Sequence, residues 1–261
     1  MPQQVALILV GLIAGVFSGL FGIGGGLVIV PALVALLGFD LKEAVGTSLA
    51  ALLLPVGIFA VIAYHRAGKL RIDTAVFIAI GLVFGAFIGA NIALNLPTRT
   101  LQQLYGVFLL YMSWRFIEPR KLWAQYRSLK TPAIEEDVPE INAPFWVLIV
   151  LGFVAGILSG MFGIGGGIVI VPALVAFLRF DQKRAVGTSL AVLLLPVSLA
   201  AVIAYYSDGK LNPGVAAFVA LGLVFGAFGG AKLALNLPTL TVKRLYGLFL
   251  LFVGLRFILQ V

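Results

Sequence analysis

Three consecutive glycines interrupt an otherwise apolar stretch of this chain, Ser18-Gly-Leu-Phe-Gly-Ile-Gly-Gly-Gly-Leu-Val-Ile-Val-Pro-Ala-Leu-Val-Ala35. Almost the same stretch returns between Ser159 and Ala176. Glycine is a poor residue for a helix interior, where each costs about 1 kcal/mol relative to alanine. Irregular backbone at membrane depth survives only where it is buried in protein or lines a cavity. The stretch therefore predicts a helix that breaks at its glycines inside a membrane.

The second copy indicates a tandem duplication. Its offset, 159 less 18 or 141 residues, also relates the Gly-Thr-Ser sequence at Gly46 to the one at Gly187. A long repeat of this kind means that each half is one structural unit. We therefore divide the chain into repeat 1 (1–117), a linker (118–142) and repeat 2 (143–261).

The composition places the chain in a membrane. Of its residues 62% are hydrophobic and 11% are charged, and the mean hydropathy is +1.14, which no water-soluble domain of this size would have. With no cysteine and a single histidine, His65, we expect no metal site, no cofactor and no enzyme. The net charge of +8 is explained by basic cytoplasmic loops and does not require nucleic acid.

Each repeat divides into one glycine-broken run and three apolar spans. Spans of this length cross a hydrocarbon core about 30 Å thick at a rise of about 1.5 Å per residue. Pro55 and Pro196 lie inside spans and predict kinks. The predicted fold is an all-α polytopic membrane protein. Its broken runs are 5–37 and 146–178, and its spans are 42–64, 73–95, 100–117, 183–205, 214–236 and 241–258.

The basic residues of the loops predict that the repeats are inverted. If each broken run is a hairpin that enters and leaves on one side, 13 basic residues lie on the linker's side, against Lys42, Arg99, Lys210 and Arg256 on the other. If each run crosses completely, the repeats are parallel and the division is 10 against 7. Cytoplasmic loops carry the excess of Lys and Arg. We therefore predict inverted repeats, a cytoplasmic linker and both termini outside.

The two glycine breaks predict an anion site. The N–H groups of a first helical turn have no partner within the helix and carry partial positive charge. Glycine permits positive φ and a close approach to the backbone. Inverted breaks would meet near the membrane midplane, and the alternative is that these glycines only permit close helix packing. The residues expected at the anion are Gly22, Gly24, Gly25, Gly26, Gly163, Gly165, Gly166 and Gly167.

Hydroxyl groups near the breaks are further candidates. A neutral hydroxyl can donate to an oxyanion, or alternatively to the carbonyl four residues earlier in its own helix. A lysine inside a span either reaches the membrane interface or adds charge to the site. The candidates are Thr47, Ser48, Thr188 and Ser189, with Ser18, Ser159 and Lys232 as secondary candidates.

The acidic residues argue against proton coupling, because all of them lie in loops, in the linker or at span edges. An anion that leaves a cell with a negative interior releases about 2.3 kcal/mol per charge per 100 mV of membrane potential, so export by uniport is sufficient. The sequence thus indicates a transporter of small anions. Two alternatives remain: a passive anion channel with the same glycine site, and a membrane assembly factor whose duplication serves packing only.

The chain resembles the TauE/SafE family of sulfite exporters. The likeness lies in the paired Ser-Gly-x-Phe-Gly-Ile-Gly-Gly-Gly sequences followed by Val-Pro, the Gly-Thr-Ser motifs and the Asn-Leu-Pro sequences at span ends. The resemblance implies transport of sulfite or of small organosulfur and carboxylate anions across the bacterial plasma (inner) membrane. It also implies that the anion lies at the two glycine triplets and the two Thr-Ser pairs. The expected partners are this anion and the lipid bilayer, without nucleic acid, and a homodimer is left open.

Overall fold

The computed structural model describes residues 3–53, 57–117, 141, 143–236 and 240–259, and within these ranges the fold is helical without strands. The all-α prediction is therefore confirmed for the part described. The predictions for the linker and for the two termini fall largely outside these ranges. The chain forms two compact units, one from Met1–Leu96 with Glu140–Leu237 and one from Pro97–Pro139 with Pro238–Val261, and each unit is described by itself.

The duplication is visible in the helix bounds, because most helices of repeat 2 begin 141 residues after their counterparts in repeat 1. Repeat 1 contains α1 (Gln3–Phe21), α2 (Gly26–Leu37), α3 (Leu41–Leu53), α4 (Ile58–Arg66), α5 (Ile72–Asn95) and α6 (Thr98–Ile117). Repeat 2 contains α8 (Phe145–Phe162), α9 (Gly167–Leu178), α10 (Gln182–Leu194), α11 (Leu199–Ser207), α12 (Pro213–Asn236) and α13 (Leu240–Leu259).

Four helices, α1, α5, α8 and α12, are long and apolar enough to cross a membrane. The number rises to six if each bent pair, α3 with α4 and α10 with α11, counts as one span. The bend between α10 and α11 is 50° and includes Pro196, as its position in the span predicted. Helices α2 and α9 have 12 residues each, or about 18 Å, which is too short to cross. The chain is thus a multi-pass membrane protein, although α6, in the expected span 100–117, is not among these candidates.

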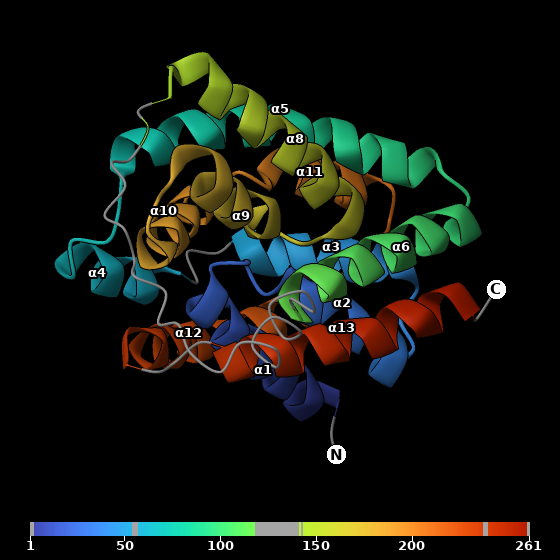
Figure 1. Cartoon of the computed structure of the whole chain (residues 1–261). Helices are drawn as coiled ribbons and strands as arrows, with labels where there is room; N and C mark the ends of the chain where they lie inside the picture. The colour runs from blue at the N-terminus through green and yellow to red at the C-terminus, as the bar shows by residue number, and fades with distance from the viewer. Residues whose placement is uncertain (1–2, 54–56, 118–140, 142, 237–239, 260–261) are drawn as a thin grey trace, which may run out of the picture. The chain divides into compact units, whose positions relative to one another are not determined.

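The long helices pair across the repeats, α5 with α8 and α1 with α12 (Figure 1). Glycines at four-residue spacing make these pairs close. A Cβ on Gly81, Gly85 or Gly89 of α5 would overlap the α8 backbone at carbonyls such as those of Ile149 and Phe153. Small residues allow helix backbones to approach in this way in membranes. These three glycines therefore serve helix packing.

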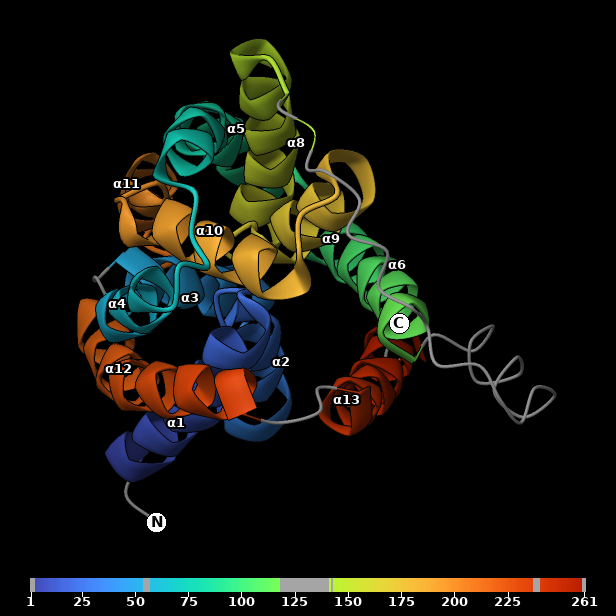
Figure 2. The ribbon, with the colours of Figure 1, turned by 60° about the vertical axis from the view of Figure 1, so that its left-hand side comes forward.

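The four short helices next to the breaks, α2, α3, α9 and α10, lie between the two long pairs (Figure 2). Helix α3 packs against α12 of the other repeat, and α10 packs against α5. Each repeat therefore contributes half of every layer in this unit. The glycine breaks lie in the buried interior of the unit, since residues 18–33 and 162–168 are buried throughout.

Equivalent loops of the two repeats lie at opposite ends of α5. The Lys42 ammonium, just after loop 38–40, donates to the Leu94 carbonyl at 2.8 Å, at the C-terminal end of α5. Loop 179–181 lies at the N-terminal end, where the Arg71 guanidinium is 5.9 Å from the ring centre of Phe180. Since α5 has 24 residues, about 36 Å separate these ends.

The second unit consists of α6 and α13, which pack against each other. The Ser113 hydroxyl donates to the Gly247 carbonyl at 2.8 Å. The Tyr105 ring meets the Phe257 ring edge-on, with centroids 5.3 Å apart. This pair thus also joins the two repeats, one helix from each.

Candidate functional site

The two glycine breaks meet. A Cβ on Gly24 would lie 3.6 Å from the Cα of Gly165, and one on Gly165 would lie 3.7 Å from the Cα of Gly24. The first residue of α2, Gly26, packs on the carbonyl of Gly163 without room for a side chain. In the same way Gly167, the first residue of α9, packs on the carbonyl of Gly22. Each helix start therefore touches the break of the other repeat.

The breaks require glycine because of their backbone conformation. The φ angles of Gly22, Gly24 and Gly25 are +67°, +81° and +81°. The equivalent residues Gly163, Gly165 and Gly166 have +70°, +73° and +79°. Residues with a side chain rarely adopt this left-handed region. The positive φ expected from the sequence is thus present in both copies.

The backbone N–H groups at the breaks lack acceptors. Within the described part of the chain, residues 23–27 and 164–168 are buried and their N–H groups form no hydrogen bond. The first N–H groups of α2 that form hydrogen bonds are those of Val28 and Ile29, which donate to the Gly25 carbonyl at 2.9 and 3.1 Å. An unpaired buried donor costs about 1–3 kcal/mol, so a group of them indicates a missing partner such as water or an ion.

Two serines occupy the carbonyls that flank the breaks. The Ser48 hydroxyl donates to the Gly163 carbonyl at 2.7 Å, and the Ser189 hydroxyl donates to the Gly22 carbonyl at 2.9 Å. Both serines are completely buried. Neither donates to the carbonyl four residues earlier in its own helix; each bonds across to the other repeat. These two carbonyls thus have donors, whereas the N–H groups beside them have no acceptor among the described residues.

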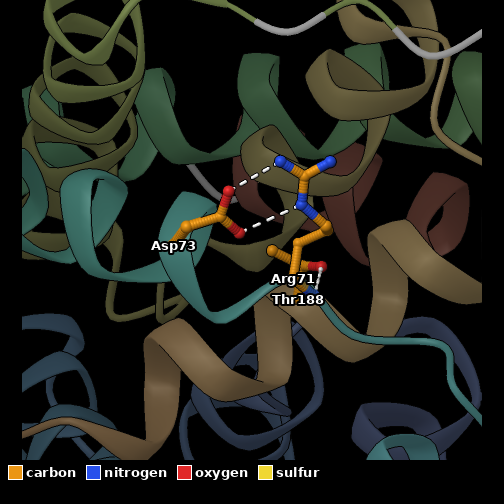
Figure 3. A network of polar contacts seen from close by, with 3 residues as sticks. All are labelled: Arg71, Asp73 and Thr188. Atoms are coloured by element: carbon orange, nitrogen blue, oxygen red, sulfur yellow. Dashed lines mark hydrogen bonds and ion pairs between the residues drawn. The ribbon is translucent and has the colours of Figure 1, made fainter.

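The two threonines of the Thr-Ser pairs have other environments. The Thr188 hydroxyl accepts a hydrogen bond of 3.1 Å from the N–H of Arg71, in the loop before α5 (Figure 3). The Thr47 hydroxyl is completely buried and has no hydrogen-bond partner among the described atoms. The serine of each pair thus lies at a glycine break, whereas the neighbouring Thr188 faces a loop.

The secondary candidates divide between the site and the surface. The carbonyls of Ser18 and Ser159 accept the N–H groups of Gly22 and Gly163 at 2.7 and 2.8 Å, which closes α1 and α8 at the breaks. The Ser159 hydroxyl is buried, and no described atom pairs with it. Lys232 is exposed, and its ammonium lies 4.3 Å from the ring centre of Phe228. A cation–π contact on the surface favours the interface interpretation of this lysine.

Sequence reasoning missed two tyrosines that support the breaks. The Tyr64 hydroxyl donates to the Gly19 carbonyl at 3.3 Å, and the Tyr205 hydroxyl donates to the Gly160 carbonyl at 3.1 Å. Both bonds fix the last turn of the helix before a break. The available signal was that these buried tyrosines are 141 residues apart, in equivalent positions of the repeats.

A cavity of about 80 Å³ lies near the start of α5, apart from the breaks. The Arg71 guanidinium and the Asp73 carboxylate form a bidentate ion pair beside it, with distances of 3.0 and 2.6 Å (Figure 3). Aromatic side chains, Phe77, Phe145 and Phe180, line much of the remainder. The charge of the one cationic side chain among these lining residues is therefore already balanced by Asp73.

A second ion pair, formed by the loop before α5, joins the two repeats. The Lys69 ammonium is 2.9 Å from the Asp181 carboxylate. Burial by itself would raise the pKa of Asp181, but the hydrogen bond and charge of Lys69 and the N–H groups of Lys183 and Arg184 hold it below its usual value. Asp181 is therefore ionised at physiological pH and can pair with the Lys69 ammonium.

Comparison with known proteins identifies the family. The family model described as "Sulfite exporter TauE/SafE" matches residues 7–257. The chain belongs to the TauE/SafE family. Probable membrane transporter protein YunE of Bacillus subtilis is 30% identical, over 98% of this chain and 97% of the relative. A probable membrane transporter protein of Methanocaldococcus jannaschii is 34% identical, over 87% of this chain and 85% of the relative. No solved structure matches the chain.

This membership confirms the resemblance inferred from the paired glycine motifs. TauE/SafE proteins are described as sulfite exporters, and the curated relatives are described as probable membrane transporters. The chain is accordingly a member of a transporter family rather than of an enzyme class.

Proposed function

We propose that this TauE/SafE protein carries small anions, with sulfite or a small organosulfur or carboxylate anion as substrate, and binds them between its two glycine breaks. The observation that supports this most strongly is the set of buried N–H groups of residues 23–27 and 164–168, which have no acceptor among the described residues. Oxyanions offer several acceptor oxygens, and a bound anion would recover the cost of these unpaired donors.

The chemistry of the breaks favours an anion over a neutral ligand. Two helix N-termini, those of α2 and α9, meet there and contribute partial positive charge. The hydroxyls of Ser48 and Ser189 donate to the carbonyls of Gly163 and Gly22, so these two oxygens repel an anion less. The site achieves this without a buried lysine or arginine at the breaks, so the anion is held weakly enough to be released.

We also propose that the two repeats are inverted across the membrane. Loops 38–40 and 179–181, which are equivalent by the duplication, lie at opposite ends of α5. The short helices α2 and α9 suit hairpins that return to their own side. The end of α5 that carries more positive charge would be cytoplasmic. The basic residues near that end are Lys69, Arg71, Arg179, Lys183 and Arg184, against Lys42 and Lys210 near the other.

Burial of the breaks favours a carrier over a channel. Residues 22–27 and 163–168 are buried on both sides of the meeting point, so an anion needs a conformational change to reach them. A channel requires a continuous path to both surfaces. A carrier opens the site to one side at a time, as rocking of inverted repeats allows.

Anion binding can be tested by thermal unfolding of the purified protein in detergent. We expect sulfite or sulfoacetate to raise the unfolding temperature in a saturable manner. A free anion concentration of 100 times Kd stabilises the folded protein by about 2.7 kcal/mol. Thiosulfate, sulfate and acetate complete the panel, and chloride is the ionic-strength control. The shift should vanish in Gly167→Ala, whose new methyl group meets the Gly22 carbonyl, and remain in Gly229→Ala, which has open space. No shift with any anion, or an equal shift in Gly167→Ala, would contradict the proposal.

A further inference from the structure

The loops that follow α4 and α11 are equivalent in the two repeats and have the same internal structure. The N–H of Lys69 donates to the Tyr64 carbonyl at 2.9 Å, and the N–H of Lys210 donates to the Tyr205 carbonyl at 2.9 Å. Each loop also lies against the Gly-Thr-Ser sequence of the other repeat. The carbonyl of Lys69 packs on Gly187, and the carbonyl of Lys210 packs on Gly46. In their backbones the two loops are close copies of each other.

Their ion pairs differ. Both residues of one such pair have equivalents in the other repeat, because Lys69 corresponds to Lys210 and Asp181 corresponds to Asp40. The Lys69 ammonium is 2.9 Å from the Asp181 carboxylate. Lys210 and Asp40, both within the described ranges, form no ion pair. Asp40 accepts the N–H of Lys42 at 3.1 Å, as Asp181 accepts the N–H groups of Lys183 and Arg184, so only the lysine pairing differs.

A backbone hydrogen bond differs in the same sense. The N–H of Arg71 donates to the Thr188 hydroxyl at 3.1 Å. The equivalent donor and acceptor are the N–H of Asn212 and the Thr47 hydroxyl, and this bond is not formed. The Thr47 hydroxyl is completely buried and has no partner among the described atoms. A buried hydroxyl without a partner is unfavourable, which indicates that its partner is gained in another conformation.

We infer that the two loops are reciprocal latches that fasten one repeat to the other, and that transport alternates between them. The Lys69 latch consists of Lys69, Arg71, Thr188 and Asp181, and the Lys210 latch consists of Lys210, Asn212, Thr47 and Asp40. In this structure the Lys69 latch is closed and the Lys210 latch is open. The inference rests on the proposed transport function, because alternation has a purpose only in a carrier.

The latches are linked directly to the glycine breaks. Thr188, which the closed latch holds, is followed by Ser189, whose hydroxyl donates to the Gly22 carbonyl. Thr47 of the open latch is followed by Ser48, which donates to the Gly163 carbonyl. If α3 or α10 shifts when a latch closes, the serine next to the latch threonine moves with it. Its hydrogen bond to a glycine break carries the shift to that break. Such a link allows the anion to bias which latch is closed.

The weakness of each latch suits alternation. The side chains of Lys69 and Asp181 are 39% and 47% exposed, so water screens their attraction. A strong, buried pair would trap the carrier with one latch closed. Two weak latches, each with one Lys–Asp pair and one N–H to threonine hydrogen bond, give two states whose balance a substrate anion can shift.

Cross-linking in proteoliposomes tests the latches, since the chain contains no cysteine. One variant carries Lys69→Cys and Asp181→Cys, a second carries Lys210→Cys and Asp40→Cys, and a third carries all four substitutions. A bis-methanethiosulfonate reagent of about the reach of a Lys–Asp pair joins each pair. Sulfite uptake is measured before cross-linking, after it, and after reduction. The single variants Lys69→Cys and Lys210→Cys, treated with the same reagent, are the controls.

We expect each cross-link to lower uptake at least tenfold, with recovery on reduction. In the variant with four cysteines, mass spectrometry of single molecules should find one cross-link or the other but never both. Uptake that survives complete cross-linking, or frequent molecules with both cross-links, would overturn the latches. If the untreated, cysteine-free protein takes up no anion, the proposed function fails instead, and the mutual exclusion of the two cross-links in detergent still decides the latches.

Discussion

At the scale of single residues, the site is defined by which polar groups have partners. Ser189 satisfies the carbonyl of Gly22, whereas the neighbouring N–H groups of residues 23–27 have no acceptor among the described residues. A hydroxyl that donates to a carbonyl thus controls the polarity of the break without touching the anion. In the proposed site, the serines would position the donors and reduce the repulsion from these two carbonyls.

Substitution of Ser189 by alanine tests this role. Ser189→Ala leaves a buried carbonyl without a donor, so the free energy of unfolding should fall by about 1–3 kcal/mol. The exposed lone pairs also repel the anion, so KM for sulfite should rise at least fivefold. Ser113→Ala is the matched control, since Ser113 makes the same kind of bond to Gly247 in the other unit. It should lose similar stability with KM unchanged; equal KM values in both variants would contradict the role.

The threonines of the two latches should respond to substitution in opposite directions. Thr47→Val removes a buried hydroxyl that has no partner in this structure and should raise the free energy of unfolding by about 1 kcal/mol. Thr188→Val leaves the N–H of Arg71 without its acceptor and should lower it by about 1 kcal/mol or more. Both are measured by thermal unfolding in detergent. Equal effects at the two positions would argue against one open and one closed latch.

Sequence reasoning reached part of the site at this scale. The glycine triplets permitted positive φ, and the structure has it at Gly24 and Gly165. The acceptors of Ser48 and Ser189 could not be predicted, because they lie 115 and 167 residues away in the chain. A hydroxyl has the same identity whether it donates within its helix, to an anion or to another repeat, so only tertiary structure distinguishes these cases.

At the scale of helices, close packing of glycines joins the repeats. Helix α8 fits α5 because Gly152, Gly156 and Gly160 admit the carbonyls of Ile78, Leu82 and Ala86. The four-residue spacing of these glycines can be read from the sequence, but the sequence does not identify the partner helix. A stripe of small residues is equally suited to any helix of matching shape, so the pairing of α5 with α8 had to come from the structure.

Alanine at this interface should separate packing from helix propensity. A Cβ in Gly156→Ala overlaps the Leu82 carbonyl, and overpacking of this kind costs about 1–3 kcal/mol. Gly229→Ala on α12 has open space and should stabilise the helix by up to about 1 kcal/mol. Unfolding temperatures of the two variants in detergent compare them directly. A stable Gly156→Ala protein would show that α5 and α8 are not in close contact.

At the scale of the whole molecule, the duplication and the loop charges are the basis of the proposed arrangement in the membrane. Composition and the apolar runs were enough to predict a multi-pass α-helical protein, because a water-soluble fold of this size could not bury a chain that is 62% hydrophobic. The sequence also predicted two breaks that meet, and Gly24 and Gly165 do meet. It predicted one kinked span at Pro196, whereas the structure has two separate helices there, α10 and α11, with a bend of 50° between them.

Inversion of the repeats predicts which loops are accessible from each side. With single cysteines in the cysteine-free chain, Lys210→Cys should react with an impermeant maleimide applied outside whole cells, and Lys69→Cys only after the cells are opened. Parallel repeats would put both equivalent positions on the same side. Reaction of both residues from outside, or of neither, would therefore contradict the inverted arrangement.

Uptake of radioactive sulfite into proteoliposomes tests the anion site between the breaks most directly. Gly26 packs on the Gly163 carbonyl, so the methyl group of Gly26→Ala should separate the breaks, whereas Gly229→Ala meets nothing within 4 Å. We predict saturable uptake that sulfoacetate inhibits, at least a tenfold loss in Gly26→Ala and an unchanged rate in Gly229→Ala. Uptake that does not saturate, or that Gly26→Ala leaves unchanged, would contradict an anion held between the two glycine breaks.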